Sequence, residues 1–510
     1  MAPDETIDWR AEALTLREFV GELRTQIEAQ ASQIEAQASQ IEVQASQIET
    51  LTTKVTRLEQ DNAQLLRRVL GPTSEKMPPI STELRRKRKR KKKDGKAERR
   101  VRAAARRALE SETVFHPVPD DQRRCPCCGK DLVVLGKPEE SVEYEFVPAR
   151  FIRRVHQREK LCCPRCKDHI VTAPPPPKVV DKGQYGPGFV GHLVTAKCAD
   201  AIPLYRQAKQ LGRLGVPVAR STMTDLFHRA AGLLLPIYLR MLQLVREGRR
   251  VLADETSFRV QDPGKCRRGF IWTFITGGLI AYLYSPDRSG ETPNKLLGGS
   301  RGTLLCDGYT GYNQVCEVDG RTRAGCLAHL RRKFFEANES APGQAKHALD
   351  VVIDIYAIEH DAAEAGILGT DEHLRLRQQR TKPIMDEFKQ WLLEQKPLHP
   401  PKSPIATAIG YALNQWEPLT AFLADPGLPP DNNESERRLR IIALGRKNYL
   451  FAGHDEGAQN LAVLMSLVVS CEANDVNPQQ YLADVLLRVQ DHPAAKIDDL
   501  LPTNWARLAA

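Results

Sequence analysis

A heptad pattern of apolar positions runs through the N-terminal part of the chain. Over residues 13–70 the first position of each heptad is mainly Ile or Val, and the fourth is Leu at both ends of the stretch and Gln in its middle. One register survives eight heptads, which predicts a coiled coil. Asn62 occupies a first position, where a single Asn favours a parallel pair. We expect residues 1–70 to form a dimer; the alternative is one long helix packed on its own protein.

Strand-like patterns begin near residue 249. Three apolar runs, 249–260, 268–278 and 279–286, follow one another closely and predict an antiparallel meander. A helical stretch separates them from a fourth run at 302–313. Residues 327–424 have almost purely helical patterns, and a polar turn then leads to a final helical region.

A helical region precedes these strands. Residues 173–178, APPPPK, mark a domain boundary because a run of prolines holds an extended linker. One helix is expected to end near Gly212–Gly215, and Ser221 is placed to cap a second. This spacing resembles a helix-turn-helix, and an ordinary helical hairpin is an equal alternative. Residues 461–469, LAVLMSLVV, have the length of a core helix rather than of a membrane span.

The charge distribution indicates that the chain binds a polyanion. The chain has 510 residues and a formal charge of +10, yet residues 85–107 alone hold 15 Lys and Arg against Asp94 and Glu98, a net of +13, which leaves about −3 elsewhere. Such a block favours contact with DNA phosphates. The expected contacts are the nine consecutive cations Arg85, Arg86, Lys87, Arg88, Lys89, Arg90, Lys91, Lys92 and Lys93. The N-terminus has no secretory pattern, and no membrane span is expected.

The cysteines predict one structural zinc. The chain has two Cys-x-x-Cys pairs with 34 residues between them: Cys125 and Cys128, then Cys163 and Cys166. Four thiolates complete a tetrahedral Zn²⁺ shell and leave no open position for catalysis. Residues 141–162 alternate as strands do, which is typical of a zinc ribbon. Cys127 and Cys162 are spare thiols that compete as ligands.

Three acidic residues suggest a second kind of metal chemistry. Asp254 and Asp307 each close an apolar strand-like run, and Glu436 lies in a polar, Arg-rich stretch of helical character. Carboxylates are the hard oxygen ligands that Mg²⁺ prefers. Two such ions clamp the attacking and leaving oxygens of a phosphoryl transfer. The pattern therefore predicts an enzyme that cuts or joins nucleic-acid backbones.

Several long motifs resemble the IS66 family of transposases. They are residues 306–313 (CDGYTGYN), 326–337 (CLAHLRRKFFEA), 431–460 (DNNESERRLRIIALGRKNYLFAGHDEGAQN) and the two Cys-x-x-Cys pairs. The resemblance covers nearly the whole chain. It implies a multidomain protein: an RNase H-like α/β core interrupted by an all-helical insertion, with a coiled coil and a zinc ribbon before it and a helical tail after it.

This organisation gives provisional boundaries. We expect a coiled coil at 1–70, a basic linker at 71–115, a zinc ribbon at 116–172, a helical region at 173–245, a core at 246–335 and 426–470, an insertion at 336–425 and a helical tail at 471–510.

The resemblance also implies site residues. Asp254, Asp307 and Glu436 correspond to the family's DDE acids, which hold two Mg²⁺ or Mn²⁺ ions. Glu436 matches the family's Asn-Asn-x-x-Glu-Arg pattern, although Ser435 stands where Ala is common. Asp431 and Glu434 keep the third ligand open, but Glu434 and Glu436 point about 200° apart on a helix.

Other residues near the acids have their own interpretations. His329 either contacts the scissile phosphate or packs beneath the site, and Cys326 is interpreted as structural. The cations expected to meet DNA here are Arg437, Arg440, Arg446 and Lys447. Asn432 and Asn433 are placed to cap the helix that carries Glu436. Glu255 falls on the opposite face of the strand from Asp254 and is interpreted as non-catalytic.

The resemblance implies a bacterial, cytoplasmic and nucleoid-associated transposase. Its expected partners are the inverted-repeat ends of its element, target DNA, a second copy or a larger synaptic oligomer, and small accessory proteins. Two alternatives stay open. One is a catalytically silent zinc-containing DNA-binding dimer, and the other is an RNase H-like nuclease acting on RNA or junctions.

Overall fold

The computed structural model describes residues 151–162, 170–173, 175–181, 183–316 and 320–509, together with residue 104 and scattered residues between 17 and 51. The chain divides into two compact units, residues 1–82 and 83–510. Every described position between 17 and 51 is helical. Ile41, Ile48 and Leu51, which are heptad core positions, are 60 to 65% exposed. The helix is therefore confirmed at these positions, whereas the coiled coil stays a prediction.

A short hairpin lies at the start of the second unit's described part. Strand β1 (Lys160–Cys162) pairs antiparallel with β2 (Ile170–Thr172). Residues 151–159, expected to be part of a strand, have no regular secondary structure. The four predicted zinc ligands and the basic run 85–93 lie outside the described residues.

A five-stranded mixed sheet carries the centre of the second unit. Its strands are β3 (Arg250–Asp262), β4 (Lys265–Thr276), β5 (Leu279–Ser285), β6 (Thr303–Leu305) and β7 (Thr322–Ala324). Their order is β5-β4-β3-β6-β7; the first three form an antiparallel meander, and β3, β6 and β7 run parallel. The expected meander and the later arrival of a fourth strand are confirmed.

Local chemistry explains the meander. Gly277 and Gly278 both have positive φ, +52° and +84°, as a two-residue hairpin turn requires. The β-branched and aromatic residues of β4 suit a buried central strand, and Trp272 and Phe274 are fully buried. The tight turn and the apolar strand both favour the hairpin of β4 and β5.

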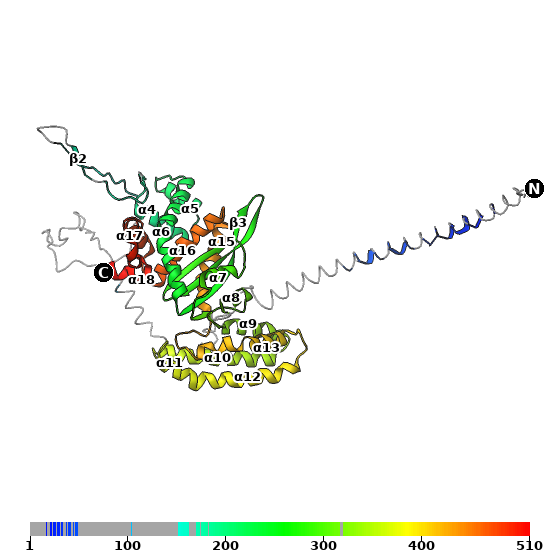
Figure 1. The fold of residues 1–510 in the computed structure, drawn as a ribbon. Helices are drawn as coiled ribbons and strands as arrows, with labels where there is room; N and C mark the ends of the chain where they lie inside the picture. The colour runs from blue at the N-terminus through cyan, green and yellow to red at the C-terminus, as the bar shows by residue number, and fades with distance from the viewer. Residues whose placement is uncertain are drawn as a thin grey trace, which may run out of the picture. The chain divides into compact units, whose positions relative to one another are not determined.

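Helices cover both faces of the sheet (Figure 1). One core packs α4 (Pro187–Cys198), α6 (Arg220–Glu247), α16 (Asp455–Ala473) and α17 (Pro478–Arg488) with the sheet. A smaller core lies under α7 (Glu291–Leu297) and α8 (Asn313–Cys316). Residues 461–471 of α16 are all buried, so the expectation of a core helix for 461–469 is confirmed.

The helical region before the sheet differs from expectation in detail. Helix α5 (Leu204–Arg213) ends where predicted, but α6 begins at Arg220 with Ala219 as its N-cap. Ser221 therefore lies inside the first turn and caps nothing. Helix α6 is 28 residues long and buries side chains from Met223 to Val245, so it is mainly a core helix rather than a free recognition helix.

Residues 327–424 are helical, as expected. The helices here are α9 (Leu327–Glu336), η3 (Ala337–Glu339), α10 (Pro342–Glu364), α11 (Asp371–Leu376), the π-helical turn η4 (Arg377–Thr381), α12 (Lys382–Gln395), η5 (Lys396–Leu398), α13 (Pro404–Asn414), α14 (Trp416–Thr420) and η6 (Ala421–Leu423). The other helices are η2 (Thr310–Tyr312), α15 (Asn433–Tyr449), η7 (Ala494–Leu500) and α18 (Pro502–Ala509). In the described part of the chain, none of the helices has the length and apolar character needed to cross a membrane.

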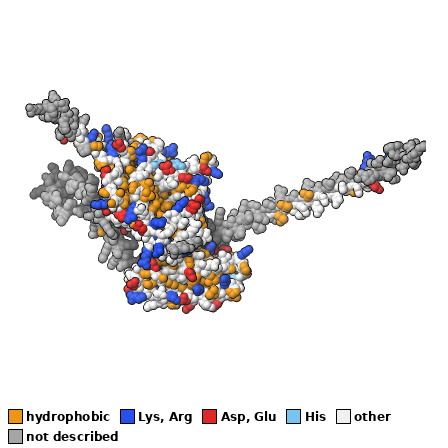
Figure 2. All heavy atoms as spheres, in the orientation of Figure 1, with side chains coloured by type: hydrophobic (Ala, Val, Ile, Leu, Met, Phe, Trp, Pro, Cys, Tyr) orange, Lys and Arg blue, Asp and Glu red, His pale blue; other side chains and the backbone are white. Residues whose placement is uncertain are grey.

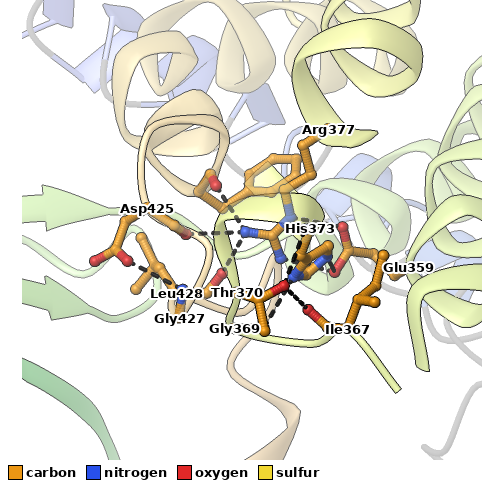
Figure 3. Close-up of polar contacts among 10 residues, drawn as sticks. Glu359, Ile367, Gly369, Thr370, His373, Arg377, Asp425, Gly427 and Leu428 are labelled. Atoms are coloured by element: carbon orange, nitrogen blue, oxygen red, sulfur yellow. Dashed lines mark hydrogen bonds and ion pairs between the residues drawn. The ribbon is translucent and has the colours of Figure 1, made fainter. Parts of the chain in front are cut away.

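A buried arginine joins the insertion to the segment that follows it (Figure 3). Arg377, 1% exposed, forms two bonds to the Glu359 carboxylate, at 2.8 and 2.7 Å. Its Nη1 also donates to three backbone carbonyls, those of Phe422, Asp425 and Leu428, at 2.8 to 3.0 Å. The segment leading to α15 is thus fixed by the insertion.

Candidate active site

Asp254 and Asp307 occupy matching positions on neighbouring parallel strands. The last ladder pair between β3 and β6 is Leu252 with Leu305, and each acid follows two residues later. Adjacent strands lie about 4.8 Å apart, so the two acids share one end of this strand pair. The expectation that Asp254 closes its strand is wrong, because β3 continues to Asp262 by pairing with β4.

Asp254 lies in a negative environment. Burial raises its pKa well above the usual value, and the neighbouring charges of Glu255, Asp307 and Glu436 raise it further. The N–H of Glu255 donates to Asp254 at 2.8 Å and acts against this shift. A half-buried carboxylate with acidic neighbours is destabilised as an anion until a cation offsets the charge. The residues present therefore suit a divalent metal.

The loop after β6 fixes Asp307. The N–H of Tyr309 donates to the Asp307 carboxylate at 2.9 Å. Arg323, on β7, donates to the carbonyls of Asp307 and Tyr309 at 2.6 and 2.8 Å and to the Asn313 side chain at 2.6 Å. Sequence reasoning missed Arg323, because nothing in its local context marks the loop it holds.

Glu255 holds the same loop from the opposite face of β3. Its side chain is 2% exposed, and its two oxygens accept from Arg288 (2.8 and 2.5 Å) and from the Tyr312 hydroxyl (2.6 Å). The Arg288 guanidinium also lies 4.2 Å from the ring centroid of Tyr309. Both carboxylate oxygens are thus engaged in structure. Sequence reasoning did not assign this role to Glu255 or to the two loop tyrosines.

The start of α15 is attached to β3 beside Asp254. The Asn432 amide donates to the Ala253 carbonyl at 2.8 Å, and the Asn432 N–H donates to the Cys326 sulfur at 3.2 Å. The expected capping by asparagine side chains is wrong: Asn432 stands at the N-cap but makes no side-chain cap bond. Asp431 accepts from the Asn433 N–H instead, at 2.9 Å.

The acids of this segment have different partners. Glu434 pairs with Arg437 and Arg438, each at 2.7 Å. Asp431 is bonded to Tyr356 and Asn433. The Glu436 carboxylate has no arginine partner and no tyrosine or asparagine partner among the described residues. One of its oxygens lies 4.0 Å from His329 Nε2. Its charge also contributes to the raised pKa of Asp254. The geometry thus favours Glu436 as the third ligand.

His329, on α9, is close enough to Asp307 and Glu436 for both carboxylate charges to affect its pKa. Burial lowers its pKa, while the charges of Asp307 and Glu436 act in the opposite direction. Its Nδ1 is buried and has no hydrogen-bond partner among the described residues. Cys326 is fully buried, and burial raises the pKa of its thiol to about 12, which fits a structural side chain.

The three acids converge without closing around an ion. Within the described ranges, no three His, Cys, Asp or Glu side chains are grouped closely enough to hold a metal as they stand. Asp254, Asp307 and Glu436 come from β3, the end of β6 and the first turn of α15.

The predicted DNA-contacting cations of α15 divide into two groups. Arg437, Arg440 and Lys447 are exposed and fall on one face of the helix. Arg446 points inward and donates to the Ser257 carbonyl and hydroxyl, and burial lowers its pKa. A contact between Arg446 and DNA stays a prediction that competes with this bond. On the face in Figure 2, Lys and Arg side chains are scattered among hydrophobic ones.

Comparisons with known proteins agree along the chain. The model described as "Transposase IS66 family" matches residues 182–460, the IS66 C-terminal element matches 466–503, and the zinc-finger binding domain of transposase IS66 matches 122–167. Two similar curated proteins are uncharacterized proteins y4hP and y4jD of Sinorhizobium fredii (strain NBRC 101917 / NGR234). The first is 32% identical over 78% of each chain. The second is 31% identical over 76% of this chain and 79% of its own.

Proposed function

The chain belongs to the IS66 family of transposases, and on this premise we propose that it is a DDE enzyme that cuts its element's inverted-repeat ends and transfers them to target DNA. Family membership supports a transposase that binds DNA and depends on divalent metal, with a zinc-finger domain. One observation supports the mechanism most directly. Asp254 and Asp307 each lie two residues after the last paired residues of β3 and β6, and Asn432 at the start of α15 bonds to Ala253 beside them.

The sheet supports an RNase H-like core. An antiparallel meander of three strands, extended on the side of its first strand by two parallel ones, places the acids of the first and fourth strands side by side. The helices between Glu336 and Asp425 then form an insertion, after which α15 returns to the sheet. This arrangement accounts for the 128 residues that separate Asp307 from Glu436.

The residues have separate roles. Asp254, Asp307 and Glu436 would hold two Mg²⁺ or Mn²⁺ ions. When bound, these ions activate the attacking oxygen and offset charge at the phosphate. Tyr309 and Arg323 keep the Asp307 loop in place, and Asn432 keeps the first turn of α15 beside β3. His329 with a lowered pKa stays neutral near pH 7 and is able to hydrogen-bond the scissile phosphate.

A strand-transfer assay tests the enzyme. Asp254→Ala should abolish cleavage of a duplex carrying the element end, in Mg²⁺ and in Mn²⁺, while DNA binding persists. Asp262→Ala, at the far end of the same strand, is the matched control and should retain activity. A wild-type protein that binds element ends but never cleaves them would leave a silent DNA-binding dimer. Preference for RNA–DNA hybrids over element ends would favour the nuclease alternative.

The zinc finger is proposed to use Cys125, Cys128, Cys163 and Cys166. Strands β1 and β2 flank the second pair in sequence, as the arms of a metal knuckle do. Elemental analysis of protein purified without chelators should find about one zinc per chain. Cys125→Ser with Cys128→Ser should remove it, whereas Cys266→Ser, an exposed cysteine on β4, should not.

The remaining partners are also proposals. We expect a homodimer through residues 13–70 or a larger synaptic oligomer, a bacterial cytoplasmic and nucleoid location, and a contribution from small accessory proteins. The exposed heptad positions Ile41, Ile48 and Leu51 support the dimer. Finding short target duplications beside inverted repeats around the reading frame would support the element as a whole.

A further inference from the structure

The end of α15 and the tip of the β3–β4 hairpin expose an unusual set of side chains. We define the hairpin surface as Arg259, Arg268, Lys447, Leu450 and Phe451, all of which are exposed. The two elements are joined, because the Ala452 N–H donates to the Arg259 carbonyl at 3.0 Å and the Gln261 N–H donates to the Ala452 carbonyl at 2.8 Å. Figure 1 shows α15 beside β3.

Two cations of the hairpin surface face each other across the strands. Arg259 is directly opposite Arg268 in the antiparallel register. Like charges in this position repel and destabilise a hairpin. Among the described residues neither arginine has an acidic partner, and Lys447 has none either. A repulsion that the fold leaves uncompensated is relieved when an anion binds between the charges.

The apolar tip of the hairpin surface is held in a costly conformation. Leu450 has φ +62° and ψ −48°, a region that a bulky residue seldom adopts, and is 61% exposed. Phe451 beside it is 39% exposed. The Leu450 N–H donates to the Arg446 carbonyl at 3.1 Å, and the Ala452 bonds to β3 fix the other side. The backbone thus presents two apolar side chains to solvent instead of burying them.

We propose that the hairpin surface is a DNA-binding site separate from the acids, in which Arg259, Arg268 and Lys447 bind backbone phosphates and Phe451, supported by Leu450, stacks on a base. Guanidinium forks match phosphate oxygens, and an aromatic ring beside a cationic groove is a stacking platform for bases. Charge complementarity selects DNA as the occupant. The proposal rests on the proposed function only for the location of the scissile phosphate.

That location gives a position along the DNA. Arg259 is five residues after Asp254 on β3. At roughly 3.3 Å per residue this is about 16 Å. One strand of duplex DNA advances about 3.4 Å per phosphate. The contacts should therefore fall about five nucleotides from the phosphate that is cut.

Binding by the full-length protein tests the apolar tip. The probe is a 40-base-pair duplex copied from the element end, without divalent metal, so that no cleavage is needed. Phe451→Ala and Leu450→Gly should each weaken binding by about fivefold or more. Leu450→Gly should also keep or raise the Tm, because glycine accepts positive φ without strain. Leu239→Ala, an exposed leucine on α6, is the control and should change neither.

The salt dependence of binding tests the cations. Arg259→Gln with Arg268→Gln should reduce the slope of log affinity against log salt by about 1.8, since each lost phosphate contact removes about 0.9. The same pair of changes should not lower the Tm, because a repulsion is removed. Arg229→Gln, whose arginine is already paired with Asp225, should leave the slope unchanged.

The position is tested with 2-aminopurine placed at successive nucleotides of the duplex. Binding should change its fluorescence most about five nucleotides from the cut, and Phe451→Ala should remove that change. Unaltered affinity, slope and fluorescence in all variants would overturn the proposal, as would a change of oligomeric state alone, which would make another protein chain the occupant. If the wild-type protein does not cleave DNA but the variants still weaken DNA binding as expected, the result counts against the proposed enzyme. It does not count against the hairpin surface.

Discussion

At the residue scale, Asn432 determines where the third acid lies. It is fully buried, its amide reaches the carbonyl that precedes Asp254, and its N–H reaches the sulfur at the start of α9. Three segments of the candidate site therefore meet at one side chain. The sequence marked Asn432 as a helix cap, since the residue that accepts its bond is 179 positions away and no local pattern reveals it.

Asn432→Ala should destabilise the fold by about 1–3 kcal/mol, because the Ala253 carbonyl loses its donor inside the protein. Loosening α15 should lower the cleavage rate by about 100-fold, the scale expected when a catalytic group moves by about 1 Å. Urea unfolding and single-turnover cleavage measure the two effects. Asn448→Ala, at the other end of α15, should leave both near wild type; equal losses in the two variants would refute the special role of Asn432.

The candidate acids were proposed from the sequence alone, whereas the residues that hold the loop around Asp307 were not found there. Asp254, Asp307 and Glu436 stand in recognisable local contexts. Arg288 and Arg323 act on a loop that reaches them only through the fold. Polar residues that are far apart in sequence become partners only through the tertiary fold. Composition and periodicity do not reveal such pairs.

At the scale of elements, the segment between η6 and α15 connects the insertion to the sheet. Arg377 holds its carbonyls, and the Asp425 carboxylate accepts two bonds from Arg250, the first residue of β3, at 2.6 and 2.5 Å. Hairpins and long helices were predictable because turn glycines and apolar periodicity are local. The start of α6 was not, because Ala219 stands at the N-cap and has no side-chain group that could signal a cap in the sequence.

Arg377→Met should destabilise the protein by about 3–5 kcal/mol, since it leaves the Glu359 carboxylate, 12% exposed, without its main partner. Thermal or denaturant unfolding measures this loss. Arg380→Met breaks a partly exposed pair with Asp361, in which the side chains are 49 and 29% exposed, and should cost no more than about 1 kcal/mol. A small effect at Arg377 would mean that the insertion is not anchored through this contact.

Asp425→Asn has a pH-dependent effect of predictable sign. Arg250 lowers the pKa of Asp425 below its ordinary value, so the folded state favours the carboxylate. The pair then stabilises the protein fully above the unfolded pKa of about 3.9, and the contribution is lost as pH falls through the lower folded pKa. The variant should be less stable than wild type by about 2 kcal/mol at pH 7. The difference should shrink below about pH 4, whereas Asp386→Asn in an exposed pair should show little difference at any pH.

At the scale of the whole molecule, the chain is a set of modules with different degrees of predictability. The heptads predict the coiled coil, the Cys-x-x-Cys pairs predict the zinc ribbon, and the acids predict the core. The same patterns do not specify how the modules are arranged, because they are local and carry no information on contacts between modules. The described sheet and helices confirm the expected meander and the helical stretch at 327–424, whereas the segments before them stay predictions.

Deletion of residues 1–70 should convert a dimer into a monomer and leave the Tm of the remaining chain within about 2 °C, because the N-terminal unit is separate from residues 83–510. Light scattering coupled to size exclusion measures the mass. Ile41→Lys with Ile48→Lys should act like the deletion, and Ser46→Lys, outside the heptad core, should not. A deletion variant that remains dimeric at high concentration would assign the dimer contact to another region.

The packing of α4 against α17 has a consequence for the timing of synthesis. Helix α17 begins 291 residues after α4 begins, and Glu436 lies between them. At roughly 5–20 residues per second, a ribosome needs about 15–60 s to cover that stretch. During that time α4 lacks the helix that packs against it, so a nascent chain exposes apolar surface of its main core. A fragment from a message that ends early should therefore be poorly soluble, and one that ends before Glu436 would also lack one of the three candidate acids.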